Sequence, residues 1–116
     1  MPEHTSREQQ LLEKAAQYMP GGSGGNTYFP SELQFLVREG RGSHLWDVSG
    51  NQYIDWLMGS GPMILGHAHP AVVDAVTEAV SQGSTFFTIN EKAVLLAEEL
   101  ANAVPCAEKV RFTTSG

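Results

Sequence analysis

The sequence predicts an α/β fold, with an α+β arrangement of elements over the 116 residues themselves. Apolar residues recur at helical spacing in three stretches, and they alternate with other residues in the stretch after the first helix. Segments rich in glycine and proline separate these regions. The expected order is a helix, a three-stranded antiparallel meander, two further helices and a final strand.

Composition and charge exclude several classes of protein. The chain is 41% hydrophobic and 17% charged, with a formal net charge of −6, which is typical of a single acidic globular domain. Its seven basic residues are scattered, so neither nucleic acid nor a membrane surface is an expected partner. Cys106 is the only cysteine, which excludes an internal disulfide and disfavours a zinc site. The start lacks a secretory signal, so we expect a cytoplasmic protein.

The first helix is expected over residues 6–18. Thr5 and Glu8 have the spacing of a capping box, in which Thr5 caps an amide of the first turn and Glu8 reaches back to the cap. Apolar residues then follow at helical spacing: Leu12, Ala15, Ala16 and Met19. Pro20 to Pro30 carries four glycines and two prolines, so this stretch is expected to be irregular.

The meander is expected from three strands, at residues 33–37, 43–48 and 52–56. Gly40-Arg41-Gly42 is expected to form the first tight turn and Ser49-Gly50-Asn51 the second. Such short connections join antiparallel neighbours, so the three strands predict a small sheet.

Three aromatic residues and two aspartates of the meander suggest binding or catalysis, but we interpret them as structural. Trp46, Tyr53 and Trp56 resemble a platform for stacking bases, but aromatic residues in strands more often pack across the sheet. Asp47 and Asp55 flank a hairpin, and we interpret them as turn and strand-end residues rather than as paired catalytic carboxylates.

The second half of the chain predicts two helices and a strand. One helix begins at His69-Pro70 and ends at Gly83, and the next is capped by Asn90 and closed by Pro105. Their expected apolar faces comprise Val72, Ala75, Val76, Ala79 and Val80 in the first and Ala93, Leu96, Ala97, Leu100 and Val104 in the second. Residues 84–89 are expected to be extended, and residues 109–112 to form a strand without an evident partner. We therefore expect the front portion of a larger protein.

Three motifs suggest chemistry, and each has a preferred structural interpretation. His67 and His69 have the spacing of two metal ligands on a strand, but no further ligand is visible nearby, so the pair is expected to shape a turn. Gly21 to Gly25 lacks the context of a phosphate-binding loop, which favours a turned surface segment. Cys106 lacks the partners of a nucleophile.

Five motifs in one order carry a family resemblance that covers nearly the whole chain. They are Pro20-Gly21-Gly22, then Gly42-Ser43-His44-Leu45-Trp46-Asp47, then Gly50-Asn51-Gln52-Tyr53-Ile54-Asp55, then the run from Gly61 to Pro70, and last Val110-Arg111-Phe112-Thr113-Thr114-Ser115-Gly116. This order resembles the class III aminotransferases, which are fold-type I enzymes dependent on pyridoxal phosphate, and in particular their glutamate-1-semialdehyde 2,1-aminomutase branch.

The resemblance implies a domain organisation, a reaction and partners. Residues 1–83 would form an N-terminal segment, the small-domain meander and the following helix, and residues 84–116 the start of the large domain that binds pyridoxal 5'-phosphate. A homodimeric enzyme would transfer an amino group between an amino acid or amine and a keto acid or aldehyde. None of the three lysines (Lys14, Lys92 and Lys109) lies in a matching Schiff-base motif, so the 116 residues alone are expected to be inactive.

The resemblance also implies which residues contribute to the site. Ser115 and Gly116 match the start of the loop that binds the cofactor phosphate, where a helix N-terminus offers free amides and glycine permits close approach. Ser60 and Tyr28 are expected in the wall of the substrate pocket. No catalytic residue and no metal ligand is expected within the chain.

Two departures distinguish the branches of the family. Ser60 stands where the aminomutase has a tryptophan, and Asn26-Thr27-Tyr28 stands where it has an arginine. Loss of the guanidinium would remove a carboxylate clamp, which favours an aminotransferase over the aminomutase. A third alternative is a non-catalytic α+β interaction module that retains the scaffold.

Overall fold

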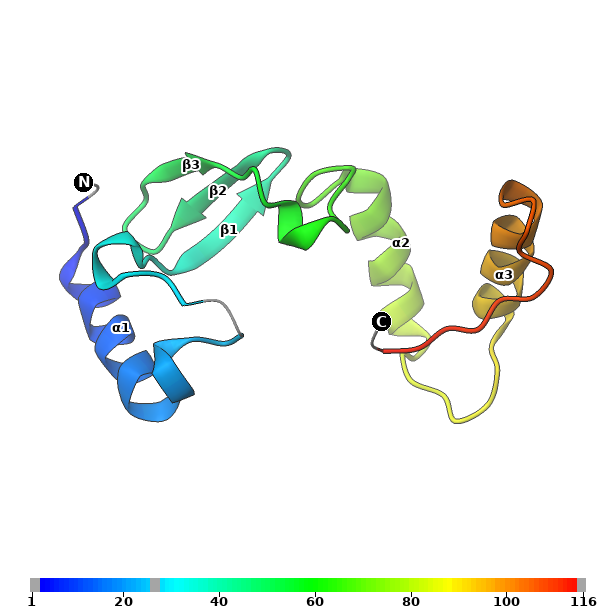
Figure 1. Ribbon diagram of the computed structural model, residues 1–116, viewed down its shortest axis with the longest axis horizontal. Coiled ribbons are helices and arrows are strands. Elements are labelled where there is room, and N and C mark those ends of the chain that lie inside the picture. The colour runs from blue at the N-terminus through cyan, green and yellow to red at the C-terminus, as the bar shows by residue number, and fades with distance from the viewer. Residues whose placement is uncertain (1–2, 26–27, 115–116) are drawn as a thin grey trace. The chain divides into compact units, whose positions relative to one another are not determined.

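The computed structural model describes residues 3–25 and 28–114 (Figure 1). The chain divides into two compact units, Met1–Ala75 and Val76–Gly116. The division falls within α2, whereas the expected boundary after residue 83 concerns the domains of the whole enzyme and stays a prediction. The elements are α1 (Ser6–Tyr18), η1 (Pro20–Gly22), η2 (Ser31–Leu33), β1 (Val37–Arg41), β2 (His44–Asp47), β3 (Gln52–Ile54), η3 (Met58–Ser60), α2 (Pro70–Ser81) and α3 (Glu91–Ala103).

Helix α1 has the predicted bounds, but only half of its predicted cap. The Thr5 hydroxyl accepts a hydrogen bond from the Glu8 amide at 3.5 Å, as a cap residue does. The Thr5 amide donates to Ser49 Oγ at 2.8 Å rather than to Glu8. The prediction that Glu8 reaches back to the cap is therefore wrong, because its carboxylate is used elsewhere.

The meander of three antiparallel strands is confirmed, with the order β1-β2-β3. Arg41 pairs with His44 across the first hairpin, and Leu45 pairs with Tyr53 across the second. The register of β1 against β2 shifts between Val37 and Glu39, which is a β-bulge. The sheet belongs entirely to the first unit.

The first strand lies later in the chain than predicted. Residues 33–37 do not form a strand; β1 begins only at Val37 and runs to Arg41. The physical reason is that the Leu36 amide donates to the Glu8 carboxylate, at 2.7 Å, instead of to a neighbouring strand. The turn consequently moves to Gly42 and Ser43, with Gly42 in the left-handed region at φ 56°.

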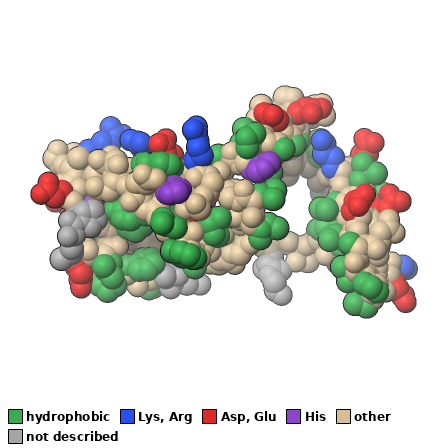
Figure 2. All heavy atoms as spheres, turned by 90° about the horizontal axis from the view of Figure 1, so that it is seen from above, with side chains coloured by type: hydrophobic (Ala, Val, Ile, Leu, Met, Phe, Trp, Pro, Cys, Tyr) green, Lys and Arg blue, Asp and Glu red, His purple; other side chains and the backbone are tan. Residues whose placement is uncertain are grey.

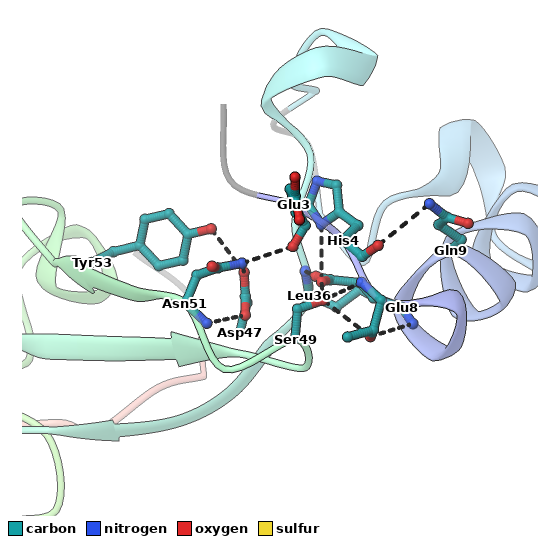
Figure 3. A network of polar contacts seen from close by, with 10 residues as sticks. Glu3, His4, Glu8, Gln9, Leu36, Asp47, Ser49, Asn51 and Tyr53 are labelled. Carbon is teal, nitrogen blue, oxygen red and sulfur yellow. Dashed lines mark hydrogen bonds and ion pairs between the residues drawn. The ribbon is translucent and has the colours of Figure 1, made fainter.

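The Glu8 carboxylate joins α1 to the meander (Figure 3). Oε1 accepts from the Leu36 amide, and Oε2 accepts from the Ser49 hydroxyl and lies 2.9 Å from His4 Nδ1. Glu8 is fully buried. Burial by itself would raise the pKa of this carboxyl, but the hydrogen bonds from Leu36, Ser49 and His4 outweigh it and lower the pKa. The buried side chain is therefore held as a hydrogen-bonded carboxylate.

A second buried carboxylate, that of Asp47, organises the β2–β3 turn. It accepts from the Asn51 amide at 2.8 Å, from Asn51 Nδ2 at 2.9 Å and from the Tyr53 hydroxyl at 2.8 Å. Burial opposes ionisation of Asp47, yet these hydrogen bonds lower its pKa. Burial, together with the bond to Asp47 and its charge, raises the pKa of Tyr53 to about 12. The interpretation of Asp47 as a turn residue is confirmed.

The aromatic side chains of the meander differ in their surroundings. Phe35 stacks on Tyr53, with ring centroids 4.5 Å apart and an interplanar angle of 17°. Tyr53 therefore packs as predicted. Trp56 is 89% exposed in the described part of the chain, so packing across the sheet is wrong for this residue. It lies beyond Ile54, the last residue of β3, and so outside the paired part of the sheet.

The second unit contains the C-terminal half of α2 and the whole of α3. Asn90 caps α3 as predicted, because its Oδ1 accepts from the Ala93 amide at 3.0 Å. The strand predicted at residues 109–112 is wrong, since the described residues there have no strand structure. A strand is stabilised by hydrogen bonds to a neighbour, and β1, β2 and β3 are the strands of the described chain.

Many hydrophobic side chains are exposed, and some of them lie on the face that Figure 2 shows. Among the described residues no hydrophobic side chain is fully buried. On α2, Val76 and Val80 are 54% and 58% exposed, and on α3 Leu96 and Leu100 are 51% and 37% exposed. The apolar residues of α2 are therefore exposed, and the expectation that α3 buries its apolar face is wrong for the described residues. No described helix has both the length and the apolar character needed to cross a bilayer.

Replacement of Glu8 by glutamine should loosen α1 from the meander. Glu8→Gln keeps the volume but loses the charge that strengthens three contacts, so we expect the free energy of unfolding to fall by about 1.5–3 kcal/mol. Urea denaturation followed by circular dichroism measures this change. Glu13→Gln, an exposed change on the same helix, is the matched control and should stay within about 0.5 kcal/mol of the unchanged chain. Equal losses for the two variants would contradict the role of Glu8.

Tyr53 should titrate late. Its folded pKa of about 12 lies above its ordinary value of 10.0, so the stability it contributes is present in full below pH 10 and is lost as the pH rises through 12. Ultraviolet absorbance of the folded chain should show a phenolate component with a midpoint near pH 12. Tyr53→Phe should remove that component. Complete phenolate formation around pH 10 in a chain that is still folded would refute the assignment.

Candidate functional site

Asp55 and His67 form a polar pair beside the end of β3. Asp55 Oδ2 lies 2.7 Å from His67 Nε2, and Oδ1 accepts from the Leu57 amide at 2.9 Å and the Met58 amide at 3.0 Å. The side chains of Asp55 and His67 are 9% and 20% exposed. The hydrogen bond from His67, followed by that from the Met58 amide, lowers the pKa of Asp55. The strand-end interpretation of Asp55 is confirmed.

The segment that Asp55 holds is a left-handed turn that contains Ser60. Met58, Gly59, Ser60 and Gly61 have φ angles of 48°, 64°, 65° and 118°. Glycine adopts such angles freely, but the left-handed conformation costs roughly 1–2 kcal/mol at each other residue. The Ser60 amide donates to the Leu57 carbonyl at 2.9 Å, and the Gly61 amide to the Met58 carbonyl at 3.2 Å. Ser60 is exposed at the surface of this turn.

Two glycines make room for His67 next to the sheet. A Cβ on Gly40 would lie 2.7 Å from His67 Cγ, and a Cβ on Gly66 would lie 2.9 Å from the Gly42 Cα. The backbones of Gly42 and His67 exchange two hydrogen bonds, of 2.9 and 2.8 Å. His67 therefore anchors the segment after the turn to the first hairpin, a long-range role that the predicted turn-shaping by His67 and His69 does not include.

Tyr28, the other predicted pocket residue, lines a different part of the first unit. Its ring covers Gly21, where an added Cβ would lie 2.1 Å from Tyr28 Cε1. The side chain is 61% exposed and borders a cavity of about 280 Å³. The apolar residues that share this cavity are Leu12, Phe29, Leu33, Phe35, Leu36 and Val37. Of the two predicted pocket residues, Tyr28 lines this cavity, whereas Ser60 belongs to the left-handed turn.

His4, Glu8 and Asp47 offer ligand atoms that all lie within 4.8 Å of one another. Such a trio has the composition of a metal site. Both carboxylates, however, already accept hydrogen bonds from backbone and side-chain donors. A metal ion would have to displace those donors, so the arrangement favours a structural role.

The described residues do not fit the cofactor by themselves. In the second unit, a pocket of about 360 Å³ lies between residues of α2 and the start of α3. Lys92 is the cation among its lining residues, and Glu91 lines the same pocket. A phosphate dianion binds best to several converging donors, which this mostly apolar lining does not supply. Ser115 and Gly116, the predicted phosphate contacts, lie outside the described residues.

Sequence reasoning missed the long-range contacts of Glu8 and the pairing of Asp55 with His67. One signal for Glu8 was available, because it lies on the same helical face as Leu12, Ala15 and Met19. A carboxylate in an apolar stripe needs a partner when that stripe is covered. Nothing in the local sequence indicates that Asp55 meets a histidine twelve residues later.

Comparison with known proteins gives one family. The family model "Aminotransferase class-III" matches residues 27–116. A glutamate-1-semialdehyde 2,1-aminomutase of Methanocaldococcus jannaschii is 41% identical over 110 residues, which cover 95% of this chain and 26% of the relative.

Solved structures give the same result. An omega-transaminase from Sphaerobacter thermophilus superposes with a TM-score of 0.88 at 32% identity, covering 98% of this chain and 26% of that one. A structure described as a transaminase with PLP bound superposes with a TM-score of 0.89 at 36% identity, covering 99% and 27%. This chain thus spans about a quarter of the length of these proteins, and it belongs to the class III aminotransferases.

Proposed function

We propose that this chain acts as the N-terminal part of an enzyme that uses pyridoxal 5'-phosphate to transfer an amino group. The donor would be an amino acid or amine and the acceptor a keto acid or aldehyde, and the enzyme would be a homodimer. The observation that carries the proposal is the family match over residues 27–116. Family membership makes a non-catalytic interaction module the weaker alternative.

Within this proposal, the described residues build the wall and the supports of a site rather than its reacting groups. Tyr28 borders an apolar cavity, and Ser60 is exposed on the left-handed turn. We assign both to the substrate pocket, and we assign phosphate contact to Ser115 and Gly116. A serine hydroxyl and the free amides at the start of a helix are suitable donors to a phosphate.

Aminotransferase activity is favoured over aminomutase activity by the residues at the pocket wall. Tyr28 supplies no guanidinium to bind a carboxylate, and Ser60 supplies no large ring to narrow the pocket. The aminomutase remains the second candidate because a relative so named is 41% identical over most of the chain.

Assay of the full-length gene product distinguishes the two activities. An aminotransferase needs an amino donor and a separate carbonyl acceptor, and it should convert the acceptor only when the donor is present. An aminomutase should convert glutamate-1-semialdehyde without any second substrate. Absence of both activities in a product that binds pyridoxal phosphate would contradict the proposal.

Ser115→Ala should weaken binding of the cofactor in the full-length gene product. Loss of one hydrogen bond to a charged phosphate costs about 1.5–3 kcal/mol, which corresponds to a dissociation constant raised about 10- to 150-fold. Titration of the apoprotein with pyridoxal phosphate, followed by visible absorbance, measures this constant. Ser31→Ala, at an exposed serine of η2, is the matched control and should bind as the unchanged protein does. An unaltered constant for Ser115→Ala would remove this serine from the phosphate site.

A further inference from the structure

The turn at residues 58–61 needs contacts with other residues to keep its left-handed backbone conformation. Four successive residues have positive φ, and two of them, Met58 and Ser60, are not glycine. Non-glycine residues in this region persist when their surroundings fix them, and such segments cluster at functional sites. The internal hydrogen bonds of the turn, from Ser60 and Gly61 to carbonyls three residues earlier, do not connect it to the sheet.

Asp55 provides that connection. One carboxylate oxygen accepts from the first two amides of the segment, those of Leu57 and Met58, and the other binds His67 Nε2. The Asp55 amide donates to the Ser43 carbonyl at 2.8 Å, so the residue itself is fixed to the first hairpin. His67 is fixed to the same hairpin through Gly42. The two ends of the segment 57–67, which contains the turn, are therefore both bound to the Asp55 side chain.

We propose that Asp55 is a positioning residue, which holds the turn 58–61 in the left-handed conformation that presents Ser60 to the substrate. Asp55 does not touch the substrate in this proposal; it acts through the turn. The link to substrate rests on the proposed function, whereas the hold on the turn rests on the contacts alone. His67 serves the same purpose from the far end of the segment.

Graded variants of the full-length gene product test the proposal. Asp55→Ala removes all three contacts. Asp55→Asn keeps an oxygen for the Leu57 and Met58 amides and so should restore most of the lost order. His67→Gln keeps an N–H donor and should resemble the unchanged protein, whereas His67→Phe keeps a ring and loses the donor. Asp74→Asn, at an exposed carboxylate on α2, is the matched control.

Two readouts separate the turn from the reaction. Hydrogen–deuterium exchange of the peptide covering residues 57–66 reports the turn without any activity, and the Ser60 and Gly61 amides in it make no direct bond to Asp55. We expect at least tenfold faster exchange in Asp55→Ala and less than threefold in Asp55→Asn. Steady-state kinetics should show KM for the amino donor raised about tenfold in Asp55→Ala, with kcat within about twofold and cofactor affinity unchanged.

Each result decides one part of the proposal. Unaltered exchange in Asp55→Ala would overturn the hold on the turn. Faster exchange with unaltered KM would overturn the link between the turn and substrate. If the unchanged protein transfers no amino group, the proposed function fails, and the exchange comparison then decides on Asp55 by itself. An equal fall of kcat and cofactor affinity in Asp55→Ala would show general unfolding and would also overturn the positioning role.

Discussion

The first unit depends on one buried carboxylate. Glu8 accepts hydrogen bonds from residues 28 and 41 positions away, and in doing so it fixes α1 to the start of β1 and to the β2–β3 turn. No apolar side chain among the described residues is fully buried, so the fully buried link between α1 and the meander is this polar one. A buried charge contributes less net stability than its contacts suggest, because desolvation opposes it. Its stronger effect is geometric, since few other arrangements of helix and sheet satisfy the same carboxylate.

Three carboxylates, each in a different place, hold segments of the first unit together. Glu8 acts over a long range, Asp47 closes a turn within six residues, and Asp55 joins a strained turn to a histidine. Each of them accepts at least one backbone amide, which aligns the chain itself rather than another side chain alone. The turns that contain Gly50 and Gly59, which have little conformational preference of their own, lie next to Asp47 and Asp55 and thereby receive defined positions.

The parts of the fold that could be predicted from the sequence are those set by interactions between residues close together in the chain. The starts of α1 and α3 were predictable because Thr5 and Asn90 cap amides three residues later. The strand at residues 33–37 was mispredicted because alternation of apolar residues does not reveal that the Leu36 amide meets a distant carboxylate. The strand at 109–112 failed for a related reason, since a strand pattern does not supply its neighbour.

The candidate site was predictable to a smaller extent. Gly59 and Gly61 indicate a turn around Ser60, but glycines do not indicate that Met58 and Ser60 adopt positive φ as well. The pairing of Asp55 with His67 depends on the path of the chain between them. Local sequence patterns, such as apolar periodicity and turn residues, do not determine this path. Motif order identified the family because it samples the whole chain, whereas the proposed pocket wall depends on the local chemistry of only two residues.

The fold and the substrate of this chain are therefore inferred from different residues. Identity over most of the chain reports the fold, and one fold accommodates many substrates. The residues that contact substrate are few, so a relative can share most of the scaffold and still act on another molecule. A turn under strain is a suitable place for such a change, because its conformation depends on Asp55 and His67 while the outward side chain of Ser60 is free to vary. Under the proposed function, a substitution at position 60 would alter the pocket without disturbing the contacts that hold the backbone.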